Sequence, residues 1–189
     1  MPTIIGISGS LRRGSFNTML LRTAVEMAPA GTTIEIESIA DVPFYDGDVE
    51  AEQGIPPSVQ RLKDRIAAAD GLLLVTPEYN GAMPGVMKNA IDWMSRPASD
   101  IGRVFRELPV GIIGASPGPG GSALAQVAWL SVLRILGCTA WFGGRFILAR
   151  ARDMFNAEGR LTDEALRGQL QKFVNGFAEF VEQHPRPKR

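Results

Sequence analysis

The sequence predicts an α/β fold in which a five-stranded parallel sheet carries helices on both of its faces. Short apolar runs alternate with amphipathic helical patterns along the chain, as they do in sheets built from β–α–β units. The 189 residues suffice for one full hydrophobic core, and no internal repeat or linker divides them. We therefore expect residues 1–189 to form a single domain.

The first half of the chain supplies two strands and two helices. An apolar, β-branched run at residues 3–8 is typical of a buried strand, and a helix is predicted over residues 19–27. Residues 33–39 alternate between apolar and polar types, which indicates a half-buried strand near an edge of the sheet. Residues 41–57 are acidic and rich in Gly and Pro, so they predict a long surface loop, and residues 58–69 predict a helix.

The second half adds three strands and three helices, and the segment from residue 72 to residue 97 organises it. This segment starts as a continuous apolar run, breaks into a polar loop, and resumes as a helix with Pro84 and Gly85 at its start. The last strand is extended by residues 146–148 past a Gly-Gly bend, and the tail after His184 is expected to fray. The elements are predicted over residues 72–75, 85–94, 109–115, 123–136, 138–142 and 162–181.

Five strands in strict alternation with helices favour the flavodoxin-like order 2-1-3-4-5 over a six-stranded dinucleotide-binding fold. Strands one, three and four each end in a loop rich in Gly, Ser or Asn. The carboxyl ends of parallel strands meet at one edge of the sheet, where open α/β sheets bind their ligands. The sequence therefore predicts a binding site built from these three loops.

The first loop, GSLRRGSFN at residues 9–17, leads directly into a helix. Backbone N–H groups and the helix dipole attract an anion there, Ser10, Ser15 and Asn17 add donors, and Arg12 adds charge. The glycine spacing resembles a Walker A loop without its lysine and does not match G-x-G-x-x-G. A single phosphate therefore fits better than a triphosphate or a pyrophosphate. The alternative is a plain strand–helix turn with a capping Ser or Asn.

The second loop contains Pro77, Glu78, Tyr79, Asn80 and Gly81. A planar heterocycle could lie on its backbone, with Tyr79 and Asn80 giving shape and hydrogen bonds. In the alternative interpretation Tyr79 is a core aromatic residue and Glu78 is solvated. Glu78 at a strand end also suits a general acid or base, although no partner for it stands nearby in the sequence.

The third loop, residues 114–118, matches the nucleophile-elbow pattern G-x-S-x-G around Ser116, and a later Asp and His184 follow in hydrolase order. The residue after the nucleophile should donate its N–H to the oxyanion, but Pro117 has none. His184 also lies in a Pro-rich tail, which is a poor place to hold a base. We interpret the loop as a wall beside a flat ligand.

Composition excludes several classes of protein. Twenty basic and twenty acidic residues balance, which disfavours nucleic acid as a partner and an acidic electron shuttle. Cys138 cannot form an intramolecular disulfide and is expected to be an inert buried thiol, and one histidine cannot build a histidine metal site. No signal peptide or membrane-length apolar run is present, so the expectation is a cytoplasmic protein without membrane insertion.

Three ligand loops without a nucleophile, a base or a metal cluster suggest that a cofactor supplies the chemistry. The loop GSLRRGSFN together with TPEYNGAMPGVMKNAIDWMSRP resembles the NADPH-dependent FMN reductase family, the flavodoxin-like quinone and chromate reductases. The similarity covers residues 4–181, and the second motif is long and specific. The resemblance implies non-covalent FMN, NADPH or NADH as co-substrate, and a homodimer or homotetramer.

The activity that the resemblance implies is ping-pong reduction of quinones or similar acceptors, such as free flavin, azo compounds or chromate, with no catalytic side chain. The rival interpretation is a flavodoxin-type electron carrier that does not itself oxidise a nicotinamide. Matched position by position, the motifs imply a phosphate site in the first loop, a ring site on the second, and closure by the third. These cofactor-binding positions are Ser10, Arg12, Ser15, Phe16 and Asn17, then Pro77, Glu78, Tyr79, Asn80 and Gly81, then Ser116 and Gly118.

Three further expectations concern the surroundings of the ring. Many family members carry a bulky residue where this chain has Gly81, which implies a more open pocket. Arg96 either reaches a neighbouring subunit or a nucleotide phosphate, or forms a salt bridge at its helix end. A set of large residues forms either the dimer face or ordinary core. The members of this set are Met83, Met87, Trp93 and Met94.

Overall fold

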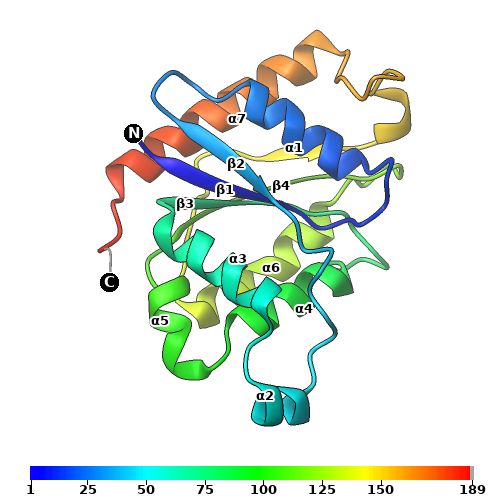
Figure 1. The fold of residues 1–189 in the computed structure, drawn as a ribbon. Helices are drawn as coiled ribbons and strands as arrows, with labels where there is room; N and C mark the ends of the chain where they lie inside the picture. Colours follow the sequence, from blue (N-terminus) through cyan, green and yellow to red (C-terminus); the bar gives the residue numbers. More distant parts are fainter. Residues whose placement is uncertain (188–189) are drawn as a thin grey trace.

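A parallel sheet forms the middle layer of the computed structural model, which describes residues 1–187 (Figure 1). The strand order is β2-β1-β3-β4-β5, as predicted, and a sixth strand also pairs with β4. Every pairing is parallel, so the carboxyl ends of the strands share one edge. The strands are β1 Thr3–Ser8, β2 Thr33–Glu37, β3 Gly71–Val75, β4 Pro109–Ala115, β5 Thr139–Ala140 and β6 Phe146–Leu148.

Helices cover both faces of this sheet (Figure 1). Helices α1 and α7 pack on one face over one apolar cluster, and α3, α4, α5 and α6 pack on the opposite face over a second cluster, while α2 stands away from the sheet. Strand β3 is buried along its whole length because helices cover it on both sides, whereas β2 at the edge is only partly buried. The helices are α1 Phe16–Glu26, α2 Gly47–Gln53, α3 Pro57–Ala68, α4 Gly85–Met94, α5 Ile101–Val104, α6 Ala123–Leu136 and α7 Glu164–Gln183.

The predicted fifth strand is two short strands separated by an excursion. The ring of Trp141 turns toward α7 and packs against Phe173, with ring centroids 4.8 Å apart. A Cβ atom on Gly143 would lie 2.5 Å from this ring, and one on Gly144 would lie 2.8 Å from it. Residues 143 and 144 must be glycines, because any side chain there would clash with the ring of Trp141. The chain returns to the edge of the sheet only at β6.

Three other expectations need correction. The acidic segment at residues 41–57 contains the short helix α2, which Asp46 caps through a hydrogen bond from the Asp48 N–H group. Helix α1 begins at residue 16 rather than 19. The tail after His184 is not frayed as far as the structure describes it, because the buried Arg186 donates hydrogen bonds to the carbonyl oxygens of residues 103 and 104.

Candidate functional site

The loop after β1 ends in a capped helix that faces the carboxyl edge of the sheet. Ser15 is the N-cap of α1, and its Oγ accepts a hydrogen bond from the Thr18 N–H group at 3.2 Å. The N–H groups of Phe16 and Asn17 lie in the first turn, so no carbonyl oxygen within the helix can accept a hydrogen bond from them. The helix therefore presents backbone donors and the positive end of its dipole to whatever lies in front of it.

Asn17 ties this helix to the end of β4. Its side-chain Oδ1 accepts a hydrogen bond from the Ala115 N–H group, and its Nδ2 donates one to the Ala115 carbonyl oxygen, both at 2.9 Å. The side chain is only 3% exposed. Its amide is thus committed to joining two of the three predicted loops, and Asn17 faces a ligand through its backbone N–H group rather than through its side chain.

The loop after β3 is tied to α6 by Glu78. The carboxylate Oε2 accepts hydrogen bonds from the N–H groups of Leu124 at 2.8 Å and Ala125 at 3.2 Å. The N-cap residue of α6, Ser122, makes no capping bond with its own side chain, so Glu78 does this from another loop. The carboxylate is therefore a structural cap rather than a solvated group or a free acid–base catalyst.

Tyr79 lies at the rim of the site and is not a core aromatic residue, since 48% of it is exposed. Its backbone exchanges two 3.0 Å hydrogen bonds with Ala82. Between them Asn80 has φ 52° and Gly81 has φ 72°, which is the backbone of a two-residue type I′ turn. The Asn-Gly pair is a strong sequence signal for this turn. The positive φ at residue 81 explains why glycine is suitable there, and the open-pocket interpretation did not consider this reason.

The loop after β4 is held by the segment that follows β6. The Ser116 N–H group donates to the Leu148 carbonyl oxygen at 3.0 Å, and the Ser116 carbonyl oxygen accepts from Ala151 N–H at 3.0 Å. Ser116 Oγ accepts from the Gly118 N–H group at 3.2 Å. His184 lies at the carboxyl end of α7, at the opposite edge of the sheet (Figure 1), so this loop has no histidine base.

These three loops enclose one cavity of about 330 Å³. Asn80, Gly81 and Gly118 are the predicted positions that do not line it. Ala115, Pro117 and Arg152 line it without having been predicted. No motif marks Arg152, because only the path of the chain after β6 brings it here. The nine predicted residues in the lining are Ser10, Arg12, Ser15, Phe16, Asn17, Pro77, Glu78, Tyr79 and Ser116.

Two arginines, Arg12 and Arg152, line the cavity. The Arg12 guanidinium lies over the Phe16 ring, 4.9 Å from its centroid. Within residues 1–187 neither Arg12 nor Arg152 forms an ion pair. Glu78, the carboxylate in the lining, already neutralises the amino end of α6. Two guanidinium groups and a helix amino end therefore favour an anionic ligand.

Residues 2–153 match the family model described as NADPH-dependent FMN reductase. The chain belongs to this family. It is 43% identical over 178 residues to an NAD(P)H-dependent FMN reductase from Pseudomonas aeruginosa, with 94% of each chain covered. It is also 36% identical over 181 residues to a quinone reductase from Escherichia coli, with 95% of each chain covered.

Solved structures agree with this assignment. The flavoenzyme NAD(P)H:(acceptor) oxidoreductase FerB from Paracoccus denitrificans superimposes with a TM-score of 0.88 at 35% identity, covering 98% of this chain and 100% of its own. An FMN-dependent NADH-azoreductase from Bacillus anthracis, solved with FMN, shares the fold with a TM-score of 0.62 at 14% identity over 96% of this chain and 100% of its own. The chain is therefore an oxidoreductase of a family that works with FMN and NAD(P)H.

The packing bears on two expectations about the surroundings of the ring. Arg96 Nε lies 2.8 Å from Glu50 Oε2 on α2, so Arg96 forms a salt bridge within the chain, and this interaction lowers the pKa of Glu50. Met87, Trp93 and Met94 are fully buried in the core, so they cannot form a dimer face. Met83 also packs against that core.

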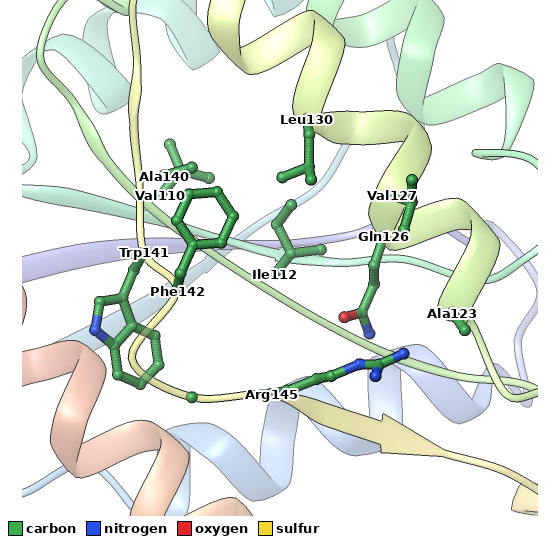
Figure 2. A pocket seen from close by; sticks show the side chains of 11 residues that line it. Val110, Ile112, Ala123, Gln126, Val127, Leu130, Ala140, Trp141, Phe142 and Arg145 are labelled. Atoms are coloured by element: carbon green, nitrogen blue, oxygen red, sulfur yellow. The ribbon is translucent and has the colours of Figure 1, made fainter.

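A second cavity of about 330 Å³ lies between α6 and the β5–β6 connection. Figure 2 shows Val127 and Leu130 projecting from α6, Trp141 and Phe142 on the connection, and Arg145 extending below Gln126. Its walls are mainly apolar. Cys138 lies in an adjoining hollow on the same side of the sheet, and burial raises the pKa of its thiol to about 12, as expected of an unreactive cysteine.

Proposed function

We propose that this oxidoreductase binds FMN without a covalent bond in the cavity at the carboxyl edge of the sheet and passes electrons from NAD(P)H to a quinone or similar small acceptor. The observation that carries the proposal is the convergence of three predicted loops on one cavity in a chain of this family. When bound, FMN supplies the redox chemistry of the reaction.

The donor set at one end of the cavity fits the phosphate group of FMN. The open N–H groups of Phe16 and Asn17, the hydroxyl groups of Ser10 and Ser15, and the Arg12 guanidinium all belong to one loop and one helix end. Phosphate is a stronger acceptor than water for such donors because it is charged. We assign this end to the phosphate and the opposite end to the ring.

The ring end is formed by the loop after β3 and the loop after β4. Pro77 and Tyr79 line one part of the cavity, and Ser116 and Pro117 line another. Asn80 and Gly81 form the rigid turn that holds Tyr79 in place, and the Gly118 N–H group holds the side chain of Ser116 in the third loop. These residues orient the ring and limit the access of water, while both substrates would reach the same exposed face in turn, in a ping-pong sequence.

No acid or base side chain is required for this function. The side chain of Glu78, which lines the cavity, accepts two backbone hydrogen bonds and caps the amino end of α6. The protein binds and positions the flavin and the substrates. NADPH or NADH supplies the electrons, and the acceptor removes them. A cytoplasmic location, where NAD(P)H is available, stays a prediction.

The rival function is an FMN-containing electron carrier, and one experiment separates the two. The purified, FMN-loaded protein is mixed with NADPH or NADH and a benzoquinone, and absorbance at the nicotinamide band is followed. We expect steady consumption of one nucleotide that depends on the quinone. Failure to oxidise either nucleotide would favour the carrier, while absence of a flavin spectrum after loading would reject both.

We further propose that the protein self-associates through the exposed apolar face of α6. Leu124, Val127 and Ile135 lie on this face and are 59%, 62% and 84% exposed. Arg134 stands at the carboxyl end of the helix and Glu78 at its amino end. Antiparallel packing of two copies would therefore join apolar faces and bring opposite charges together at both ends.

The mass of the protein in solution tests this interface. We expect Val127→Asp and Ile135→Asp to lower the mass measured by light scattering to that of one chain. Phe44→Asp, at an equally exposed aromatic residue far from α6 in the chain, should leave it unchanged. A monomeric parent protein, or variants that assemble as the parent does, would contradict the proposal.

A further inference from the structure

We propose that Arg152 is a second cation of the phosphate site and that it makes the protein select FMN over riboflavin. This proposal rests on the proposed function, because it concerns the ligand of the same cavity. Arg152 belongs to a short 3-10 helix, Ala151–Asp153, that follows β6 and is outside all three predicted loops. Its side chain lines the cavity together with Ser10, Arg12 and Ser15.

The backbone before Arg152 is anchored to the end of β4. The Arg150 N–H group donates to the Gly118 carbonyl oxygen at 3.1 Å, and the Ala151 N–H group donates to the Ser116 carbonyl oxygen at 3.0 Å. Ala151 is fully buried. The position of Arg152 relative to the third loop is therefore set by two hydrogen bonds and by a packed methyl group.

The backbone after Arg152 is anchored to the amino end of α1. The ring of Phe155 stacks on that of Phe16, with centroids 6.0 Å apart and planes 12° apart. Phe16 is the first residue of α1, and the Arg12 guanidinium lies on its ring. Arg152 is thus held between the end of β4 and the helix end that carries the phosphate donors, and it lines the same cavity as Arg12.

Charge balance gives this second arginine a role. A phosphate monoester carries between one and two negative charges at neutral pH. The amino end of α1 contributes about half of a positive charge and Arg12 contributes one. Among the described residues Arg152 has no ion-pair partner, and the neighbouring Asp153 does not line the cavity. Arg152 would bring the site close to neutrality with a dianion and add charge-assisted hydrogen bonds.

Riboflavin has the same ring system and side chain as FMN but no phosphate, so it isolates this contribution. The protein is freed of flavin, and FMN or riboflavin is titrated while quenching of flavin fluorescence is measured. We expect Arg152→Ala to weaken FMN binding by about 10- to 100-fold, the usual cost of losing hydrogen bonds to a charged group. Riboflavin binding should change less than about twofold, within the small effect expected of a residue that makes no contact with that ligand.

The matched control is Arg13→Ala, which removes an equal charge from an exposed neighbour of the site that does not line the cavity. It should alter FMN affinity far less than Arg152→Ala does, and added salt should weaken FMN binding more in the parent than in Arg152→Ala. An equal loss for FMN and riboflavin, or no loss for either, would overturn the role of Arg152. If the parent protein binds neither flavin, the proposed function itself fails.

Discussion

At the scale of single residues, several polar side chains in the site bind other parts of the protein. The side-chain amide of Asn17 forms hydrogen bonds with the backbone of Ala115, and the carboxylate of Glu78 accepts hydrogen bonds at the amino end of α6. Such buried or half-buried groups fix the three loops relative to one another, because a polar group without a partner would be costly. In the proposed site, hydroxyl groups, backbone N–H groups and two arginines therefore remain for the cofactor.

Ser15 allows the phosphate assignment to be tested without loss of the helix. Aspartate is as good an N-cap as serine, so Ser15→Asp should keep α1 capped while it places a negative charge at the amino end of the helix. We expect the purified variant to lose its yellow colour and to keep the melting temperature of the flavin-free parent.

The control for this variant is Ser15→Ala, which removes the cap without adding charge. It should cost about 1 kcal/mol of stability, and it should lower the flavin content less than Ser15→Asp does, because it removes one hydroxyl donor without adding a negative charge. Unchanged flavin content in Ser15→Asp would show that the phosphate lies elsewhere.

At the scale of elements, the local backbone conformation explains why residue 81 is glycine, whereas the family resemblance related this glycine to an open pocket. The Asn80-Gly81 turn needs positive φ at both positions, and this requirement holds whatever occupies the cavity. A Cβ atom on Gly81 would meet only the Leu124 side chain, at an ordinary 3.5 Å. Backbone conformation, rather than lack of space, therefore makes glycine the suitable residue.

This reason predicts the result of substitution in the turn. Gly81→Ala should destabilise the protein by about 1 kcal/mol, because alanine is strained at positive φ, and Gly81→Tyr should carry the same penalty in addition to any effect on the acceptor. Asn80→Gly should cost only a few tenths of a kcal/mol, since glycine adopts this φ freely. Urea unfolding of the flavin-free protein measures both, and equal stability of Gly81→Ala and the parent would contradict the strain.

At the scale of the whole molecule, one ion-pair network joins the helices beneath the sheet, away from the proposed flavin site. The buried Lys63 of α3 lies 2.8 Å from Asp100, and Arg103 of α5 binds Asp100 at 2.7 Å. Lys63 also donates a hydrogen bond to the Arg96 carbonyl oxygen at the end of α4. Removing the central carboxylate would leave a buried ammonium group without its counter-charge.

This network should make stability depend on acid pH. Hydrogen bonds from Arg103, and then from Lys63, hold the pKa of Asp100 well below its usual range. The contribution of Asp100 is therefore complete above about pH 4, the unfolded pKa, and is lost as the pH falls below it. Asp100→Asn should lower the free energy of unfolding by about 3 kcal/mol at pH 7, and the difference in this free energy between the variant and the parent should become smaller below pH 4.

Urea unfolding at several pH values checks this expectation. Asp64→Asn is the control, because Asp64 pairs with the same Arg103 but its side chain is 56% exposed. It should cost less than about 1 kcal/mol at pH 7. A difference between Asp100→Asn and the parent that stays constant down to pH 2 would show that the carboxylate is not preferentially ionised in the folded protein.

Much of the fold could be predicted because most strands and the long helices follow from the residue patterns of their own segments. Apolar runs and helical periodicity locate β1, β3, β4 and the long helices, and strict alternation orders the sheet. The α2 helix was missed because its seven residues bury no apolar face, so no periodic signal exists. The break between β5 and β6 depends on Trp141 packing against a helix that is distant in sequence, and no local pattern records this contact.

Sequence patterns were enough to predict the parallel sheet, its order, the edge that carries the three loops, and a family whose members work with FMN and NAD(P)H. These features follow from patterns that each segment carries alone. The folded chain, in contrast, shows which side chains in the cavity already have partners within the protein. It gave Asn17, Glu78 and Arg96 partners within the protein and brought Arg152 to the cavity. The physical reason is that hydrogen bonds and ion pairs between distant segments depend on how the helices pack on the sheet.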